Sequence, residues 1–325
     1  MVKIDLVTGF LGSGKTTFIR RYAQYLLSRG ERVCILENDY GAINVDMMLL
    51  SDLQSDRLGI EMVAGGCDYD CHRRRFRTKL ITMAMLGYTR VIVEPSGIFD
   101  VDEFFDILHE SPLDERYEIA NVLTIVKADL ESDFSEEADY MLASQIAEAG
   151  CVVLSHVQET SQAVMDETIR HINRALETIH CRRQFSLGHG ILAKDWKDLT
   201  DEDFAAIASS GYYETAFEKK YSMDETSFVS LFFMNVSLSA SEVIDRIPKV
   251  FRDPAAGHVI RVKGFLEKED GSWIEVNATE KGLQFNPIRA GQKILIVIGE
   301  RLDEHYIDTY FPAEFSTTHR GLEMF

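Results

Sequence analysis

The most constraining feature of the chain is the segment GFLGSGKTTF, which directly follows an apolar stretch near the N-terminus. Its spacing, Gly9-x-x-x-x-Gly14-Lys15-Thr16, is the phosphate-loop pattern. Glycines let the backbone turn so that successive N–H groups point at an anion, the lysine reaches the outer phosphates, and the threonine hydroxyl can bind Mg²⁺. The segment predicts a nucleoside triphosphate site formed by Gly12, Ser13, Gly14, Lys15, Thr16 and Thr17.

The residues on either side of this loop match the strand and the helix that the pattern requires. Ile4–Val7 has the apolar composition of a buried strand, and apolar residues recur at helical spacing from Phe18 to Leu27, before Gly30. A helix that begins here directs the positive end of its dipole at the phosphates. This context favours a phosphate loop over a chance glycine-rich turn.

Up to about residue 185, strand-like apolar runs alternate with helical patterns. The predicted strands are Ile4–Val7, Val33–Leu36, Val91–Val93, Val122–Val126 and Cys151–Leu154, and the clearest helices are Phe76–Leu86 and Ser161–Ile179. This alternation predicts a mostly parallel sheet flanked by helices, an α/β P-loop NTPase domain over residues 1–190. The acidic and less regular residues 191–225 are expected to form a connector with one short helix.

Residues 226–325 predict a smaller α+β domain. Its expected strands are Phe228–Val236, Val259–Leu266, Trp273–Val276 and Ile294–Ile298, and its expected helices are Ala240–Phe251 and Asp303–Tyr310. None of these segments carries a catalytic motif, so we expect the chemistry to lie in the first domain.

Charge and composition restrict the partners. The formal net charge is −19, which argues against nucleic acid or an anionic membrane, because both require a basic face. No charged leader with an apolar signal region and no apolar run of roughly twenty residues is visible, so we expect a cytoplasmic protein. Five cysteines in a chain of this size are more typical of reduced thiols and metal binding than of a disulfide framework.

Two acidic segments each follow a predicted strand, at the sheet end where nucleotides bind. Glu94-Pro95-Ser96-Gly97 places a carboxylate near Mg²⁺, and the N–H of Gly97 can contact a terminal phosphate. In Glu37-Asn38-Asp39-Tyr40-Gly41, Glu37 and Asp39 can position Mg²⁺ or the attacking water. An acidic turn with no role in catalysis remains an equal interpretation of the second segment.

A third segment, GGCDYDCHRRRF, carries soft metal ligands. Cys67 and Cys71 are four residues apart, so their sulfurs can face one point, with His72, Asp68 and Asp70 as further ligands. Sulfur with imidazole favours zinc or a neighbouring transition ion over Mg²⁺. The alternative is a pair of reduced thiols at the start of a basic helix, whose arginines at 73, 74, 75 and 77 contact phosphate, a partner or solvent.

Taken together, GFLGSGKTT, ENDYG, GGCDYDC and EPSG resemble the CobW-type GTPases, relatives of the nickel-insertion GTPases of hydrogenase and urease maturation. HVIRVKGFL and ILIVIGERLD resemble the CobW C-terminal domain, so the resemblance covers nearly the whole chain. It implies slow GTP hydrolysis with Mg²⁺ at Thr16 and Glu94, and binding of zinc or another transition metal near Cys67. It also implies a client metalloprotein or metal-cofactor enzyme that receives the ion.

Two departures from the family pattern leave alternatives open. The family motif C-x-C-C is replaced by Cys67 and Cys71 with three residues between them. The guanine-selecting [N/T]-K-x-D segment is replaced by Ser155-His156-Val157-Gln158, and a neutral glutamine lacks the charge-assisted discrimination against adenine. GTP is the first choice on family grounds, and ATP is the alternative. A nucleotide-gated binding module with little or no hydrolysis is the rival function.

Overall fold

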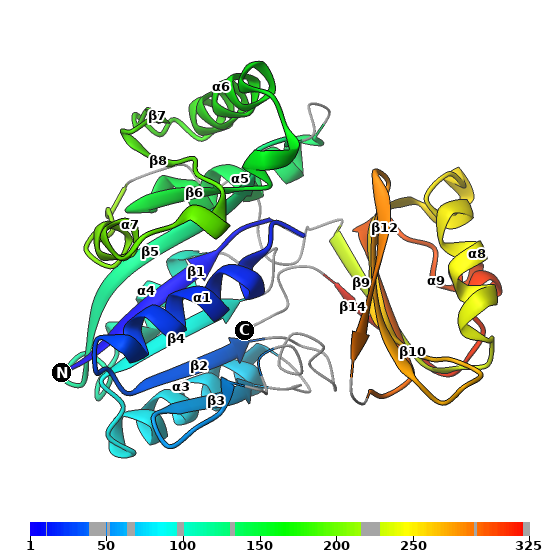
Figure 1. The fold of residues 1–325 in the computed structure, drawn as a ribbon, viewed down its shortest axis with the longest axis horizontal. Helices are drawn as coiled ribbons and strands as arrows, with labels where there is room; N and C mark the ends of the chain where they lie inside the picture. The colour runs from blue at the N-terminus through cyan, green and yellow to red at the C-terminus, as the bar shows by residue number, and fades with distance from the viewer. Residues whose placement is uncertain are drawn as a thin grey trace. The chain divides into compact units, whose positions relative to one another are not determined.

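A computed structural model describes residues 1–10, 12–38, 50, 53–63, 69–95, 101–130, 134–215, 228–288 and 291–320. The chain divides into two compact units, the first described up to residue 215 and the second from residue 228 onward (Figure 1). The first is an α/β unit and the second pairs an antiparallel sheet with helices, which confirms the predicted fold class.

The described part of the first unit contains an eight-stranded sheet in the order β3-β2-β4-β1-β5-β6-β8-β7, and its strand pairs are all parallel. The strands are β1 Val2–Thr8, β2 Val33–Asn38, β3 Leu58–Val63, β4 Arg90–Pro95, β5 Tyr117–Lys127, β6 Cys151–Ser155, β7 Ser186–Leu187 and β8 Gly190–Leu192. Since parallel strands end at the same edge, the loops after β1, β2, β4 and β6 leave the sheet on one side.

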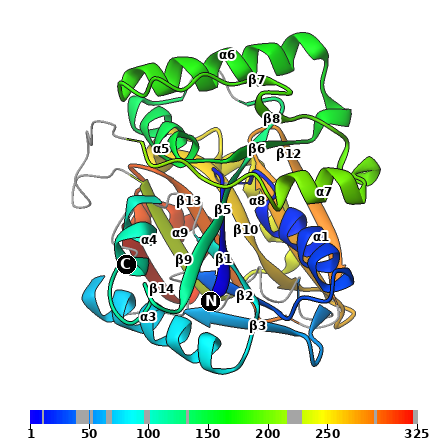
Figure 2. The ribbon, with the colours of Figure 1, turned by 90° about the vertical axis from the view of Figure 1, so that its left-hand side faces the viewer.

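Helices cover both faces of this sheet. They are α1 Lys15–Ser28, α3 Tyr69–Met85, α4 Val101–Leu108, α5 Glu136–Ala147, α6 Gln162–Thr178 and α7 Asp201–Ile207, with the short turns η2 Val157–Glu159 and η3 Trp196–Asp198. Figure 2 shows α1 and α7 on one face and α3 and α4 on the other. The apolar side of α1, including Phe18, Ile19 and Tyr22, is fully buried in a core shared with Phe204 and Ile207 of α7.

Several of the acidic residues after residue 191 belong to the first turn of helix α7. Thr200 caps α7, its side chain accepting from the N–H of Asp203 while the Asp203 carboxylate accepts from the N–H of Thr200. Asp201 and Glu202 complete an acidic first turn, where negative charge interacts favourably with the helix dipole. Much of this acidic stretch is therefore the start of a helix that packs on α1 in the first unit.

The second unit contains, in its described residues, a six-stranded antiparallel sheet in the order β12-β11-β10-β13-β9-β14. Its elements are β9 Phe228–Val236, α8 Ala240–Val250, η5 Pro254–Ala256, β10 His258–Glu267, β11 Trp273–Thr279, β12 Gly282–Ile288, β13 Ile294–Glu300, α9 Glu304–Tyr310 and β14 Ala313–Arg320. One face of the sheet and the apolar sides of α8 and α9 form a single core. All the strands and helices predicted for this unit are present, and β12 and β14 are additional.

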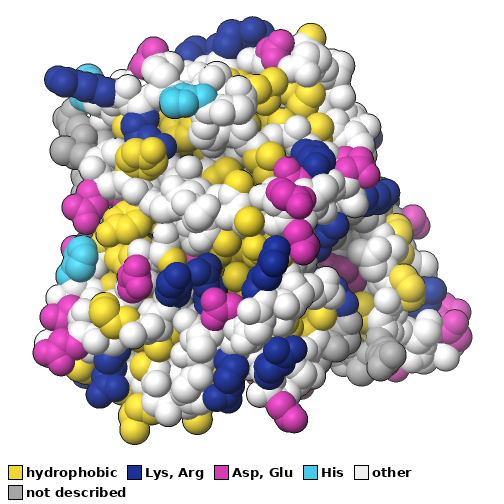
Figure 3. Space-filling view, turned by 60° about the vertical axis from the view of Figure 1, so that its left-hand side comes forward, with side chains coloured by type: hydrophobic (Ala, Val, Ile, Leu, Met, Phe, Trp, Pro, Cys, Tyr) yellow, Lys and Arg dark blue, Asp and Glu magenta, His cyan; other side chains and the backbone are white. Residues whose placement is uncertain are grey.

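Within the described ranges, no helix combines the length and the hydropathy that a membrane span needs. On the face shown in Figure 3, Lys and Arg side chains are interspersed with Asp and Glu.

Candidate nucleotide site

The loop between β1 and α1 has the backbone conformation of a phosphate loop. Gly9, Gly12 and Gly14 have φ angles of 145°, 75° and 96°, a region that side chains disfavour. A Cβ on Gly9 would lie 2.3 Å from the carbonyl oxygen of Ile125 in β5, so a side chain has no room there. The N–H of Ser13 donates to the carbonyl of Phe10 at 3.1 Å, which closes the turn.

Two side chains inside the loop fit an anionic ligand. Lys15 is only 8% exposed, and its Nζ donates to the carbonyl of Gly9 at 3.0 Å. The buried Oγ of Ser13 has no hydrogen-bond partner among the described residues. A phosphate oxygen satisfies both a buried ammonium group and an orphaned hydroxyl, so the residues present fit a bound phosphate.

Hard oxygen ligands gather at the start of α1. The Oγ1 of Thr16 donates to Oε1 of Glu94 at 2.9 Å, which joins α1 to the end of β4. Glu37 at the end of β2 is the register partner of Glu94, so the two carboxylates stand side by side on adjacent strands. Both are buried, with exposed fractions of 2% and 5%. Two carboxylates and a hydroxyl are the ligand types that Mg²⁺ prefers.

This cluster follows from the strand order. β4 lies between β1 and β2, so the residue that ends β4 is brought next to the phosphate loop after β1 and next to the residue that ends β2. The sequence predicted roles for Glu37 and Glu94 separately, and the register shows that they are neighbours.

The predicted base segment also lies near the loop. Ser155 ends β6, and its Cβ is 3.9 Å from the position that a Cβ on Gly14 would occupy. His156 adopts a left-handed conformation with φ of 56°, and its Nδ1 is 3.0 Å from Oε2 of Glu159. The Nε2 of Gln158 donates to Oε1 of the same glutamate at 3.2 Å. The side chains of His156 and Gln158 are therefore both oriented by Glu159.

Trp196 is a residue of this site that the sequence analysis missed. Its Nε1 donates to the carbonyl of Leu154 in β6 at 2.9 Å, and its ring packs edge-on against Phe18 of α1 with 5.7 Å between centroids. A Cβ on Gly14 would lie 3.2 Å from its ring. Trp196 thus contacts α1, β6 and the phosphate loop together. The signal in the sequence was a tryptophan, one of two in the chain, within a segment assigned to a connector.

Several predicted site residues lie outside what the structure describes. Asp39, Gly97 and Cys67 belong to undescribed segments. Cys71 and His72 fall in the backbone of α3, but their side chains are not described. Among the described residues, no group of three or more His, Cys, Asp and Glu side chains is arranged to hold a metal ion.

The cysteines whose side chains the structure describes lie in β2, in β6 and after α6. Cys34, Cys151 and Cys181 are free thiols. Mainly through burial, the pKa of Cys34 is raised to about 12 and the pKa of Cys151 to about 11. These two thiols stay protonated at neutral pH and are poor metal ligands.

The phosphate loop, its oxygen ligands and the parallel sheet define a P-loop nucleotide-binding protein. The family model described as "CobW/HypB/UreG, nucleotide-binding domain" matches residues 3–184, more than half of the chain, so the chain belongs to this family. The resemblance drawn from the sequence motifs of the first domain is confirmed.

Curated relatives are similar over about half of the chain. The zinc chaperone YeiR of Escherichia coli is 27% identical over 162 residues, 50% of this chain and 48% of that protein. The zinc chaperone YjiA of the same organism is 25% identical over 183 residues, 53% and 55% of the two chains. The zinc-regulated GTPase metalloprotein activator 1 of Schizosaccharomyces pombe is 24% identical, over 56% of this chain and 46% of that protein. The matched region thus spans about half the length of these relatives.

Among solved structures, the Zn(II)-bound YjiA GTPase from E. coli matches 95% of this chain and 97% of its own, with 18% identity and a TM-score of 0.36. The hydrogenase maturation factor HypB from Archaeoglobus fulgidus matches 61% of this chain and 82% of its own, with 16% identity and a TM-score of 0.37.

Proposed function

We propose that the protein hydrolyses a nucleoside triphosphate, GTP before ATP, and couples this slow reaction to the capture and delivery of a transition-metal ion such as zinc. The hydrogen bond from Thr16 to Glu94 at 2.9 Å carries the proposal, because it joins the phosphate loop to a carboxylate 78 residues away. Family membership and the zinc chaperones among the relatives support the same function.

Each part of the site has an expected role in hydrolysis. The N–H groups of residues 12–17 and the ammonium of Lys15 bind the phosphates, and Gly97 contacts the terminal one. Thr16 and Glu94 hold Mg²⁺, which neutralises charge that develops on the phosphate oxygens. Glu37, with Asp39, orients the attacking water.

The residues proposed to bind the captured metal are Cys67, Cys71 and His72. Strand register supports a link between this segment and the nucleotide site. Asn38 at the end of β2 pairs with Val63 at the end of β3, so both strands leave the sheet at the same edge. Asp39 comes directly after β2, and Cys67 comes four positions after Val63, the last residue of β3. A change in the segment after Glu37 is thus expected to affect the segment that carries Cys67.

The base segment favours a weak preference for GTP. Guanine presents N–H donors that an aspartate accepts with charge assistance, whereas the amide of Gln158 is neutral and already donates to Glu159. We therefore expect ATP to compete, with Ser155, His156 and Gln158 facing the base.

Phosphate release from GTP and ATP, measured side by side with and without zinc, tests the hydrolase. Lys15→Ala is expected to abolish triphosphate binding and turnover, because it removes the buried ammonium that binds the phosphates. If the wild type releases no phosphate above background under any of these conditions, the protein is a nucleotide-gated binding module.

Equilibrium dialysis with zinc, with and without a non-hydrolysable GTP analogue, tests the coupling. The double variant Cys67→Ser/Cys71→Ser is expected to lose zinc binding, whereas Cys151→Ser, which changes a high-pKa thiol in β6, retains it. Zinc affinity that is the same with and without the analogue, or equal in both variants, contradicts the coupled metal site.

A further inference from the structure

Trp196 lies in the first unit at a point where three structural elements meet. It is the first residue of the turn η3, which follows β8 in the chain. Its indole N–H donates to the carbonyl of Leu154 in β6, and its ring lies edge-on against Phe18 of α1. The ring atoms Cη2 and Cζ3 lie 3.2 and 3.5 Å from the position that a Cβ on Gly14 would occupy. One side chain thus joins the end of β6 to the phosphate loop.

The hydrogen bond of the indole lies just beyond the point where β6 and β8 stop pairing. The last register pair of these strands is Val153 with Leu192. Leu154 is the next residue of β6 and is fully buried, and its carbonyl accepts from the indole of Trp196 at 2.9 Å. A buried carbonyl needs a donor, because leaving it without one costs free energy. The indole therefore supplies this donor at the end of β6.

The end of β6 is held on its other side by β5. The N–H of Ala128, directly after β5, donates to the carbonyl of Ser155 at 2.9 Å. The Oγ of Ser155 donates to the carbonyl of Val126 at 3.4 Å. The next residue, His156, turns the chain in a left-handed conformation with φ of 56°. The base segment, residues 155–158, thus leaves the sheet from a strand end that β5 and the indole hold together.

The turn that carries the indole is itself anchored to α7. Lys194, two residues before Trp196, donates to Oδ2 of Asp203 in α7 at 2.6 Å. The side chain of Asp195 caps η3 by accepting from the N–H of Lys197 at 3.0 Å. With its ring against α1 as well, the indole has a position that helices α1 and α7 determine. It can therefore restrain the end of β6.

We propose that Trp196 is a positioning residue for the nucleotide. Its indole N–H holds the base segment at a fixed distance from the phosphate loop, so that the base and the phosphates of one nucleoside triphosphate are bound together. The inference rests on the proposed function, because it requires a nucleoside triphosphate in this site. It assigns part of the base-dependent affinity to a residue outside both the phosphate loop and residues 155–158.

The expected effect follows from the population of the binding position. Without the indole N–H, the end of β6 is held on one side only and occupies the binding position for a smaller fraction of the time. The apparent affinity falls by that fraction. The net contribution of one hydrogen bond corresponds to a change in population of up to about tenfold. We therefore expect the affinity for GTP and ATP to fall about tenfold, whereas tripolyphosphate, which has no base, binds as before.

Calorimetric titration of the full chain with Mg²⁺ and non-hydrolysable analogues of GTP and ATP, and separately with tripolyphosphate, provides the test. The chain has two tryptophans, so in a Trp273→Phe background benzothienylalanine can replace Trp196 alone. Sulfur then stands in place of the indole N–H and the shape of the ring is kept. We expect weaker binding of both analogues and unchanged binding of tripolyphosphate. Trp196→Phe, a second variant without the donor, is expected to weaken binding of both analogues as well.

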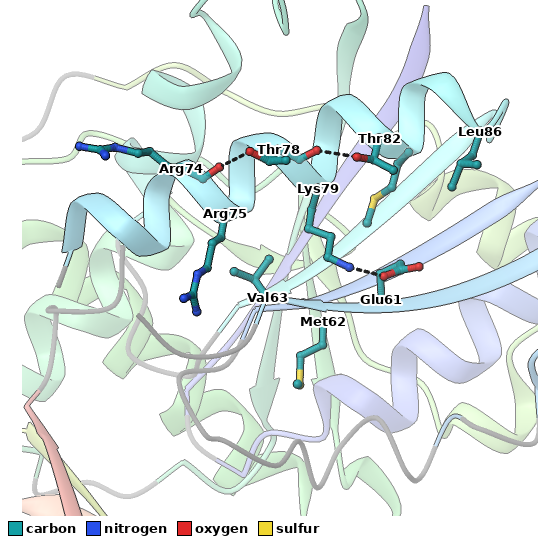
Figure 4. A pocket seen from close by; sticks show the side chains of 10 residues that line it. Glu61, Met62, Val63, Arg74, Arg75, Thr78, Lys79, Thr82 and Leu86 are labelled. Atoms are coloured by element: carbon teal, nitrogen blue, oxygen red, sulfur yellow. Dashed lines mark hydrogen bonds and ion pairs between the residues drawn. The ribbon is translucent and has the colours of Figure 1, made fainter. Parts of the chain in front are cut away.

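Tyr117→Phe in the same background is the matched control. The buried hydroxyl of Tyr117 donates to the carbonyl of Leu80 in α3 at 2.7 Å, so this variant also removes an aromatic donor from a backbone carbonyl. Tyr117 pairs with Val2 at the start of β1, at the sheet edge opposite the phosphate loop. Helix α3 lies beside β3, with a groove of about 490 Å³ between them that no residue of the phosphate loop or the base segment lines (Figure 4). We expect the control to bind all three ligands as the background protein does.

Two results would overturn the inference when the background protein binds both analogues. Equal affinities with and without the indole N–H mean that this group does not position the base. A parallel loss of tripolyphosphate binding in the benzothienylalanine protein means that Trp196 supports the phosphate loop instead. A background protein that binds neither analogue refutes the proposed nucleotide function, and the inference with it. Thermal melting followed by circular dichroism verifies that all the variants are folded.

Discussion

Replacement of Arg90 by methionine tests how a buried ion pair stabilises the first unit. Arg90 of β4 is 4% exposed, and its Nη1 donates to Oδ2 of the fully buried Asp5 in β1 at 2.7 Å. Two neutral groups also donate to Asp5, the hydroxyl of Tyr22 at 3.0 Å and the Nδ2 of Asn121 at 2.7 Å. Arg90→Met leaves the carboxylate in the core with these two donors but without its positive partner.

Removing one partner of a buried pair costs about 3–5 kcal/mol, because the remaining charge is desolvated and uncompensated. Unfolding a domain in urea has a slope of about 3 kcal/mol per molar. Dividing the first figure by the second predicts that the urea midpoint falls by roughly 1–2 M at neutral pH.

The effect has a defined pH dependence. Burial raises the pKa of Asp5 above its ordinary value of 3.8, and Arg90 is the strongest opposing influence. A carboxyl group whose pKa is higher in the folded than in the unfolded protein contributes its full stability at pH values below the pKa of the unfolded state. This contribution is lost as the pH rises through the pKa of the folded state. In Arg90→Met the folded pKa rises further, so this loss extends to higher pH. The difference from wild type is therefore greatest near neutral pH and shrinks as the pH falls toward 4.

The assay uses a Trp273→Phe background, in which the fluorescence of Trp196 reports unfolding of the first unit alone. Asp5→Asn/Arg90→Met removes both charges and is expected to be more stable than Arg90→Met at neutral pH. If the midpoint of Arg90→Met changes equally at pH 5 and pH 7.5, or if the double variant is no more stable, an uncompensated Asp5 charge is not the cause.

Three further predictions concern the nucleotide site. Thr16→Val and Glu94→Gln are each expected to lower Mg²⁺-dependent phosphate release about a hundredfold or more, with nucleotide affinity in EDTA nearly unchanged; a parallel loss of affinity in EDTA would instead indicate a damaged loop. In the Trp273→Phe background, GTP is expected to change the emission of Trp196 while tripolyphosphate changes it less, and equal responses would mean that the indole senses only the phosphates. Gln158→Asp is expected to raise the ratio of GTP to ATP affinity about tenfold, measured by competition, because it restores a charged acceptor; an unchanged ratio would place base selection elsewhere.

The phosphate loop and its flanking elements were predictable because they are local. The loop needs glycines at fixed positions, a buried strand before it and an amphipathic helix after it, and all of these occur within about thirty residues. Glu94 was also predictable, since a carboxylate directly after a strand is expected at the nucleotide edge of a parallel sheet.

The two strands of the second unit that were not predicted, β12 and β14, lack the apolar pattern that marks a buried strand. In β12 most residues are exposed and the sequence contains Pro287, and β14 has the largely polar sequence AEFSTTHR. Such strands form at sheet edges because a neighbour pairs with their backbone, and their own side chains give little signal. Both lie at the two ends of the antiparallel sheet.

Pairings between distant segments were not visible in the sequence. That Glu37 stands beside Glu94 depends on register between two strands about fifty residues apart, and the contacts of Trp196 depend on where β8 joins the sheet. Likewise, the run of arginines at 73–77 reads as one basic cluster, yet contacts with Glu110 and Ser111 engage two of its members.

The chemistry of the two proposed ion sites suggests how one chain holds two kinds of metal without exchange between them. The described edge beside the phosphate loop offers only oxygen, from Thr16, Glu94 and Glu37, which suits Mg²⁺. The proposed capture segment supplies sulfur and imidazole, from Cys67, Cys71 and His72, which suit zinc. Because the two ligand sets discriminate by hardness, coupling between them does not require a shared ion. It requires only that the chain leaving β2 and the chain leaving β3 influence each other at the sheet edge where Asn38 and Val63 are paired.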